Sequence, residues 1–152
     1  MPGFISDNPL AHDLIRIGND AIAKEDDAKL RDYFAEDYTF HGPGRELGYE
    51  ELRAYFASLR SAFTGLRIVR EQIIVDGNFL AARSVFSGDF TDVFTYSPIG
   101  PVNPTGEHIE WEVIGTFRYD DAGRLAEEWV QTDYRGLLTK LGVTVAESAA
   151  RA

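Results

Sequence analysis

Two acids, an indole and an amide alternate near the end of the sequence. The segment EEWVQTD puts Glu127, Trp129, Gln131 and Asp133 at every second position, and side chains at that spacing share one face of a β-strand. In an apolar cavity, an aspartate beside an indole would have a raised pKa and could accept or donate a proton. An acid at a strand end is also a common N-cap of the following helix, and spacing alone favours this second interpretation of Asp133.

A second strand is expected to pair with this one. The segment HIEWEVIGTFRY precedes the turn DDAG, so the two strands would form an antiparallel hairpin. In a register of the right parity, Arg118 lies near Glu127 and Glu112 lies near Asp133, with Ile114 on the same face. We interpret Arg118 and Glu127 as a structural salt bridge.

The opposite face of the same hairpin is apolar. It carries Trp111, Val113, Phe117 and Val130, which would lie on the outside of the sheet if the acidic face forms the pocket wall. A large exposed apolar patch marks an association surface. We therefore predict a homodimer or a higher homo-oligomer that forms through this face.

Two histidines are further candidates for a site. His41 lies between YTF and GPG, and a rigid turn rich in Gly and Pro could aim its imidazole into the mouth of a cavity. His108 alternates with Glu110 and Glu112, a pattern that could hold a hard metal ion. No further spaced ligand follows nearby, so we expect no metal site.

Arg83 stands in an otherwise apolar strand, and the turn DGN before that strand decides its partner. A three-residue loop would set Arg83 opposite Glu71 as a cross-strand ion pair. A two-residue loop would set it opposite Arg70, an unfavourable neighbour, and Arg83 would then need another partner. The ion pair is the simpler interpretation, and a place in the pocket wall is the alternative.

Helices are expected before the sheet. Asn8 and Pro9 form a helix start, and apolar residues then recur at helical spacing as far as residue 22. A short second helix begins at Asp26 or Asp27, EDYTF turns extended, and HGPG breaks the chain. Residues 49–63 form a third helix with one apolar side.

Strands dominate the second half. LRIVREQIIV and FLAARSVFSGDF flank the turn DGN, and a short helix YRGLLTKL follows the final hairpin and ends at Gly142. The loop TYSPIGPVNPTG carries three of the six prolines and could be a lid. This order predicts an α+β fold, with helices on one face of a curved antiparallel sheet and a cavity between them. Residues 1–152 are expected to form one domain, ordered from about residue 8 to 142.

The composition restricts the partners. Fifteen basic and 25 acidic residues give a net charge of −10, which repels nucleic acids and anionic membrane surfaces. Without cysteine, the chain offers neither a disulfide nor a thiol nucleophile. The sequence shows no signal peptide, no long apolar run and no phosphate-binding glycine motif. We expect a cytoplasmic protein that does no nucleotide-dependent chemistry.

Several segments together resemble a known family. HGPG at 41–44, LRSAFTGLRI at 59–68, PTGEHIEWEVIGTFRYDDAGRLAEEWVQTD at 104–133 and GLLTKLG at 136–142 are similar to the SnoaL-like polyketide cyclases, also described as ester cyclases. The similarity runs from about the first helix to Gly142. It implies the cone-shaped, α+β nuclear transport factor 2-like fold, in agreement with the expected layout. The loop before PTG is longer than is usual in the family, so the substrate would differ.

The resemblance also implies an activity. Characterised members close a ring of a polyketide ester by an intramolecular aldol reaction without metal or cofactor. An aspartate acts as their general acid/base, and its place after E-x-W corresponds to Asp133. His41 corresponds to a histidine that is common in the family and would be a second polar contact. An acidic carbon between carbonyl groups needs only a weak base, so one tuned carboxylate suffices.

The leading hypothesis is therefore a cyclase-type enzyme that acts on a small molecule and uses no cofactor. Its predicted catalytic residues are Asp133 and His41. Eight further residues are predicted to bind the substrate: Phe40, Tyr55, Phe63, Arg83, Glu112, Ile114, Trp129 and Gln131. One alternative is an isomerase or an epoxide hydrolase, and the hydrolase would need an arginine between two aspartates. The other is a binding protein in which Asp133 only caps the last helix.

Overall fold

The computed structural model describes residues 3–144 of the chain, as helices packed on a sheet. The helices are α1 (Pro9–Arg16), the π-helical segment η1 (Ile17–Ile22), α2 (Asp27–Tyr33), α3 (Tyr49–Ala62) and α4 (Tyr134–Lys140). The strands are β1 (Phe34–Gly42), β2 (Arg45–Leu47), β3 (Phe63–Asp76), β4 (Phe79–Phe90), β5 (His108–Tyr119) and β6 (Leu125–Thr132). The predicted α+β class is confirmed.

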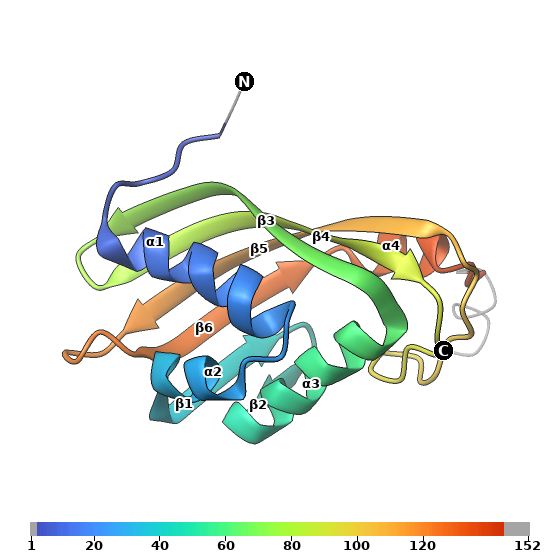
Figure 1. The fold of residues 1–152 in the computed structure, drawn as a ribbon, viewed down its shortest axis with the longest axis horizontal. Coiled ribbons are helices and arrows are strands. Elements are labelled where there is room, and N and C mark those ends of the chain that lie inside the picture. The colour runs from blue at the N-terminus through green and yellow to red at the C-terminus, as the bar shows by residue number, and fades with distance from the viewer. Residues whose placement is uncertain (1–2, 145–152) are drawn as a thin grey trace.

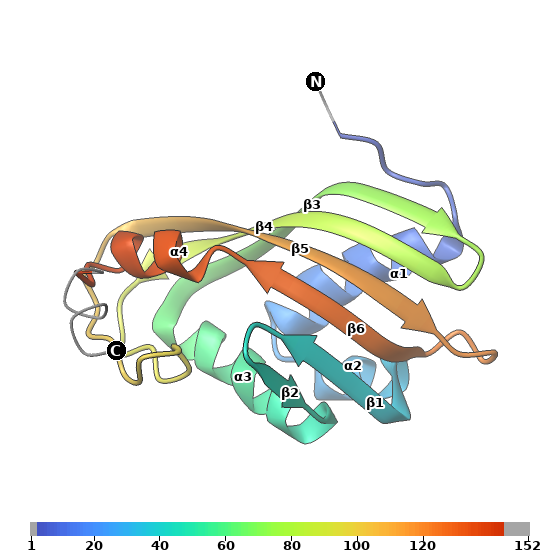
Figure 2. The same ribbon diagram turned by 180° about the vertical axis from the view of Figure 1, so that it is seen from behind.

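Two layers make up the molecule. Helices α1, α2 and α3 cover one face of the sheet, which we call the inner face (Figure 1). Seen from behind, β3 to β6 are uncovered on the opposite, outer face, and α4 lies beside the end of β6 (Figure 2). The core therefore lies between the inner face and the three helices.

The helix starts follow from local sequence. Asn8 Oδ1 accepts a hydrogen bond of 2.9 Å from the amide of Leu10, with Pro9 as the first helical residue. Asp26 caps α2 in the same way, through a bond of 3.2 Å from an amide of its first turn. Both predicted starts are confirmed, because a side-chain oxygen satisfies an amide that has no partner within the helix.

The sheet is mixed, with the strand order β2-β1-β6-β5-β4-β3. β1 runs parallel to β6, and all other neighbours are antiparallel. The prediction of a purely antiparallel sheet is therefore wrong at β1. The sequence predicts that EDYTF is extended, but the local pattern of a strand does not show which distant strand it pairs with.

An irregularity in β3 decides which of its side chains face the helices. Arg70 lies opposite Ser84 and Gln72 lies opposite Arg83, so Glu71 is an extra residue in a β-bulge. A bulge shifts the alternation of side chains between the two faces by one position. Arg70 can therefore face the helices although the next buried residue of the strand is Ile73, three positions later.

Arg83 has neither of the two partners considered from the sequence. The turn has two residues, because Asp76 pairs with Phe79. The regular pairing that starts at this turn runs as far as Gln72, which lies opposite Arg83. Nη1 of Arg83 lies 3.8 Å from Glu112 Oε2 on β5. Arg83 thus pairs across the outer face with the neighbouring strand.

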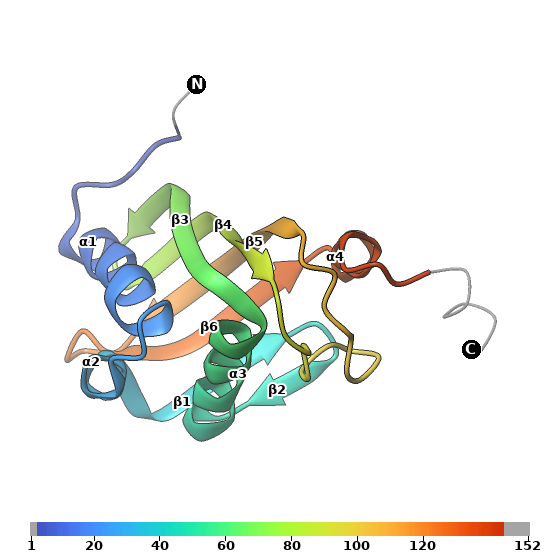
Figure 3. The same ribbon diagram turned by 45° about the vertical axis from the view of Figure 1, so that its right-hand side comes forward.

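The long loop between β4 and β5 closes one end of the molecule (Figure 3). Phe94 and Val102 pair within it and are both buried. The Tyr96 ring lies 6.0 Å from that of Tyr55 on α3, and the Tyr96 carbonyl accepts a hydrogen bond of 3.4 Å from Arg45 on β2. The loop is therefore packed against the mouth of the space between helices and sheet.

Candidate functional site

A cavity lies between the three helices and the inner face of the sheet. The volume open to the centre of a water molecule is about 90 Å³. Its walls are mostly apolar and come from both layers: Leu14, Ile17, Ile22, Leu52, Phe56, Ala82, Phe86, Trp111, Val113, Phe117, Leu125, Val130 and Leu137. An apolar pocket with a few polar groups is the usual form of a small-molecule site.

The face of the β5–β6 hairpin that lines this cavity is opposite to the predicted one. Its register is as expected, since Arg118 lies opposite Glu127 and their side chains are 3.3 Å apart. However, Trp111 and Phe117 are 6% and 7% exposed and line the cavity. The prediction that they form an exposed dimer surface is wrong, because burial favours the more apolar of the two faces of a strand.

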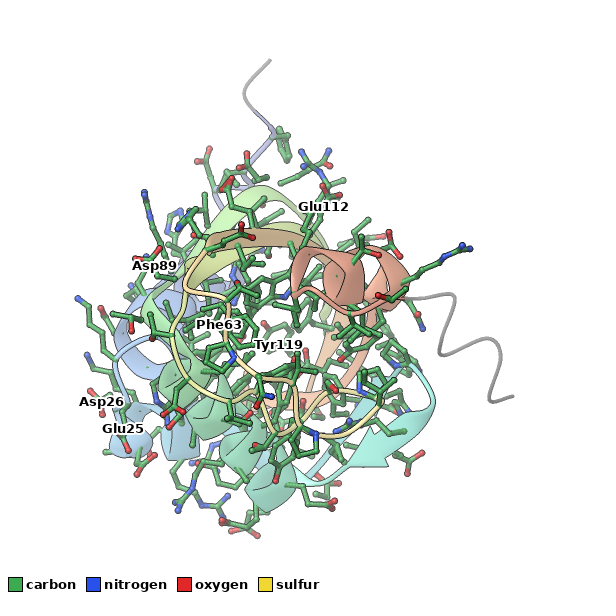
Figure 4. The ribbon with its side chains drawn as sticks, turned by 90° about the vertical axis from the view of Figure 1, so that its right-hand side faces the viewer. Glu25, Asp26, Phe63, Asp89, Glu112 and Tyr119 are labelled. Atoms are coloured by element: carbon green, nitrogen blue, oxygen red, sulfur yellow. The ribbon has the colours of Figure 1, made fainter. Side chains whose placement is uncertain are left out.

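As a result, most predicted substrate-binding residues are not in the cavity wall. Five of the eight lie on the outer face: Arg83, Glu112, Ile114, Trp129 and Gln131. Phe63 is buried in the core, with its ring 4.9 Å from that of Trp111, and Figure 4 shows it inside the molecule and Glu112 at the periphery. Of the predicted set, Phe40 and Tyr55 line the cavity.

Asp133 lies outside the cavity. Its carboxylate caps α4, because Oδ1 accepts a hydrogen bond of 2.9 Å from the amide of Gly136. The residue is exposed and borders a groove on the outside of the molecule, together with Glu112 and Lys140. The expected place of Asp133 in an apolar pocket is therefore wrong, while the alternative interpretation as a helix cap is confirmed.

His41 belongs to a network on the outer face. Its Nε2 lies 2.7 Å from Glu127 Oε2 and its Nδ1 lies 3.3 Å from Glu46 Oε2. The imidazole also stacks on the Trp129 ring at 5.3 Å. The hydrogen bond with His41 is the main cause that holds the pKa of Glu127 below its usual value, and partial burial opposes it. His41 thus lies away from the cavity mouth where it was expected.

The carboxylate that faces the cavity is Glu128, which the sequence analysis did not single out. Its side chain is 6% exposed, and the Tyr38 hydroxyl donates a hydrogen bond to Oε1. Burial raises the pKa of Glu128 to about 7, although Tyr38 and Arg70 favour the charged form and oppose the shift. Glu128 can therefore exchange a proton near neutral pH.

Further polar side chains surround Glu128, and together they form the interior polar cluster: Tyr33, Tyr38, Arg70, Ser84, Tyr119 and Glu128. The hydroxyl groups of Tyr33 and Tyr119 are hydrogen-bonded to each other. Burial raises the pKa of both tyrosines, which keeps them neutral. Tyr119 is 1% exposed and lies near the centre of the view in Figure 4. Four members of the cluster line the cavity: Tyr33, Arg70, Ser84 and Glu128. The other polar side chains of its wall are those of Arg45, Tyr55, Thr132 and Tyr134.

The sequence does contain a signal for Glu128. It alternates with Ala126 and Val130, two apolar residues, on the strand that pairs with β5. If the apolar face of this strand is the inner one, the acid on that face must be buried. For Arg70 the signal is weaker, since its inward direction depends on the bulge at Glu71.

Among residues 3–144, no group of three or more acidic or histidine side chains is arranged to hold a metal ion. The strand with His108 and Glu110 does not form one, since His108 Nδ1 lies 2.8 Å from Asp89 Oδ1. No helix in this part of the chain is long and apolar enough to cross a membrane.

Solved structures with the same fold are known. A protein of Jannaschia sp. CCS1, provisionally described as a SnoaL-like polyketide cyclase, has a TM-score of 0.76 at 18% identity and covers 91% of this chain and 98% of its own. IdmH of Streptomyces antibioticus, provisionally described as a polyketide cyclase, has a TM-score of 0.71 at 24% identity, over 90% and 100% of the two chains. AclR of Streptomyces galilaeus, provisionally described as a hydroxylase, has a TM-score of 0.71 at 20% identity, over 88% and 92%.

These names differ in the activity they state, so the shared fold does not decide the reaction. No curated protein matches the chain significantly. The profile of the SnoaL-like domain, in contrast, matches residues 17–128, which is more than half of the sequence and includes the cavity-lining strands up to Glu128. The chain belongs to the SnoaL-like domain family.

Proposed function

We propose that the protein is an acid/base enzyme of the cyclase type that acts on a small apolar ester inside the cavity. The observation that supports it most is Glu128, a carboxylate that is 6% exposed and lines an apolar cavity. A carboxylate whose pKa is about 7 is suited to take a proton from a carbon atom between two carbonyl groups.

The proposed reaction is an intramolecular aldol ring closure. Ionised Glu128 removes the proton of the acidic carbon, and the resulting enolate carbon attacks a second carbonyl carbon of the same molecule. A carbon–carbon bond forms, and the new alkoxide takes the proton back from Glu128. The reaction is redox-neutral and returns the carboxylate to its starting form, so it requires no cofactor. The cavity walls orient the substrate chain for attack.

Asp133, the residue implied by the family resemblance, is the rival for this role. We propose Glu128 because Asp133 is exposed and already caps α4. The same capping contact favours a second candidate function, a binding protein whose cavity holds an apolar ligand unchanged. An epoxide hydrolase with an arginine between two acids is not favoured, since Glu128 is the one carboxylate among the described cavity-lining residues.

The test compares Glu128→Gln with Asp133→Asn on a panel of aromatic and aliphatic 1,3-dicarbonyl esters. Deuterium exchange at the acidic carbon, followed by NMR, reports proton abstraction even where no ring forms. We expect Glu128→Gln to slow the exchange by at least about 100-fold and Asp133→Asn to leave it within about twofold. The opposite pattern would assign the role to Asp133, and binding without exchange in the wild type would favour the binding protein.

We also propose that two copies associate through the outer face of the sheet. Four large apolar side chains are exposed there by 40% to 53%: Ile74, Phe79, Ile114 and Trp129. The strand register places all four on the same side. The predicted homodimer would thus use these residues in place of the buried ones named from the sequence.

A further inference from the structure

Arg70 is the member of the interior polar cluster whose hydrogen-bonding capacity is least used. A guanidinium carries five N–H groups. Protein acceptors take two of them, Ser84 Oγ at 3.0 Å from Nη1 and the Leu14 carbonyl at 3.5 Å from Nη2. The Nε atom is buried and has no hydrogen-bond partner among the described residues. Because Arg70 lines the cavity, the N–H groups that the protein leaves free can donate to an acceptor on a ligand bound there.

The position of Arg70 is built by two elements of the fold. The bulge in β3 sets Arg70 opposite Ser84 on the inner face. On the other side, the guanidinium packs against Gly18 of η1, where a Cβ atom would lie 3.2 Å from Nη2. The side chain is therefore held between sheet and helix, and it contributes to the cavity wall.

The positive charge of Arg70 lacks a direct counter-ion. None of the ion pairs within residues 3–144 includes Arg70, although Glu128 lines the same cavity. Tyr33 and Tyr119 are neutral and cannot neutralise it. A partly buried cation without an ion-pair partner favours a ligand that brings a negatively charged oxygen.

We propose that Arg70 is the anion-binding group of the cavity, and that the ligand is a small apolar molecule with one negatively charged oxygen, a carboxylate or an enolate. This inference rests on the proposed function, because it concerns the same cavity. When Glu128 removes the proton from carbon, the negative charge of the enolate moves onto the carbonyl oxygen. N–H groups of Arg70 that are already in place would stabilise that oxygen.

The test uses two probes of the same shape, cinnamate and its neutral amide, cinnamamide. We expect the wild type to bind cinnamate at least about tenfold more tightly, since a hydrogen bond to a charged oxygen is stronger than one to a neutral amide oxygen. In Arg70→Met this preference should disappear while the affinity for cinnamamide stays within about twofold. Isothermal titration measures the four affinities, and the Arg Nε–H signal that Arg70→Met removes should shift with cinnamate in the wild type.

Equal affinities of the two probes for the wild type, or no binding of cinnamate, would overturn the proposal without any need for a folded variant. A preference that persists in folded Arg70→Met would overturn it as well. Glu128→Gln separates this inference from the proposed function, because it should stop deuterium exchange and retain the preference for cinnamate. Loss of exchange in Glu128→Gln with equal binding of both probes to the wild type would leave the enzyme function standing and remove only the anion site.

Discussion

Glu128 links the stability of the fold to pH. Its pKa is about 7 in the folded protein and near 4.5 in an exposed carboxyl, so between these values the folded state binds one proton more than the unfolded state. The contribution of the protonated form is fully present below pH 4.5 and is lost as the pH rises through 7. The wild type should therefore lose up to about 3 kcal/mol of unfolding free energy over this range relative to Glu128→Gln.

Urea unfolding at about pH 5 and about pH 8 measures this difference for both proteins. Gln keeps the shape of the side chain and can still accept the hydrogen bond of Tyr38. The comparison between the two proteins removes the titration of all other carboxyl groups, which they share. If the two stabilities change in parallel with pH, Glu128 is ionised in the folded protein over the whole range and its proposed role as a base near neutral pH loses its support.

The role of Asp133 as the cap of α4 can be tested by substitution. Asparagine is as good an N-cap as aspartate, whereas alanine offers no acceptor to the amide of Gly136. Asp133→Ala should therefore lower the unfolding free energy by about 1 kcal/mol, and Asp133→Asn should change it little. Urea denaturation measures both. An equal loss in the two variants would mean that the charge of Asp133, and not its capping bond, stabilises the protein.

At the scale of elements, the sequence predicted the kind and the place of each helix and strand more reliably than their faces. Helix caps at Asn8 and Asp26 and the turn at Gly77 are local features, and the structure has all three. The direction of a strand face depends on what covers it. For β5 the apolar residues Trp111 and Phe117 indicate the buried face, whereas the resemblance to the family, through its aspartate, favours the opposite face.

The bulge in β3 shows why part of the site was beyond local prediction. An alternating pattern assigns a strand residue to a face only while the pairing is regular. The extra residue Glu71 changes the phase between Arg70 and Gln72. A face assignment for Arg70 made from Ile73 by counting in twos would therefore have placed it outside, although it lines the cavity.

The close packing of β3 on β4 can be tested by adding a side chain at Gly88. A Cβ atom on Gly88 would lie 2.8 Å from the Phe63 Cβ and 3.3 Å from the Thr64 carbonyl oxygen, closer than atoms pack without a shift of the backbone. Gly88→Ala should therefore cost roughly 1–3 kcal/mol of unfolding free energy. The matched control is Ser87→Ala, one position away. Urea denaturation that shows equal stability for both variants would contradict this close approach.

At the scale of the whole molecule, the two faces of the sheet differ in what covers them and in which side chains they carry. The inner face and the helices enclose the cavity with its polar cluster, and the long loop packs against one end of it. The outer face carries ion pairs such as Arg83 with Glu112 and Arg118 with Glu127, and exposed apolar side chains between them. A surface of this mixed kind is typical of a protein–protein interface, whose apolar contacts are framed by polar groups.

The proposed dimer can be tested by a charge on its most exposed apolar residue. Ile114 is 53% exposed on the outer face, and Ile114→Glu would bring two added negative charges together in a symmetric interface of a chain that already carries −10. We expect light scattering to give twice the chain mass for the wild type and the single mass for the variant. Ile99→Glu is the control, because Ile99 is 49% exposed in the loop between β4 and β5. A monomeric wild type, or a variant that stays dimeric, would remove the outer face as the interface.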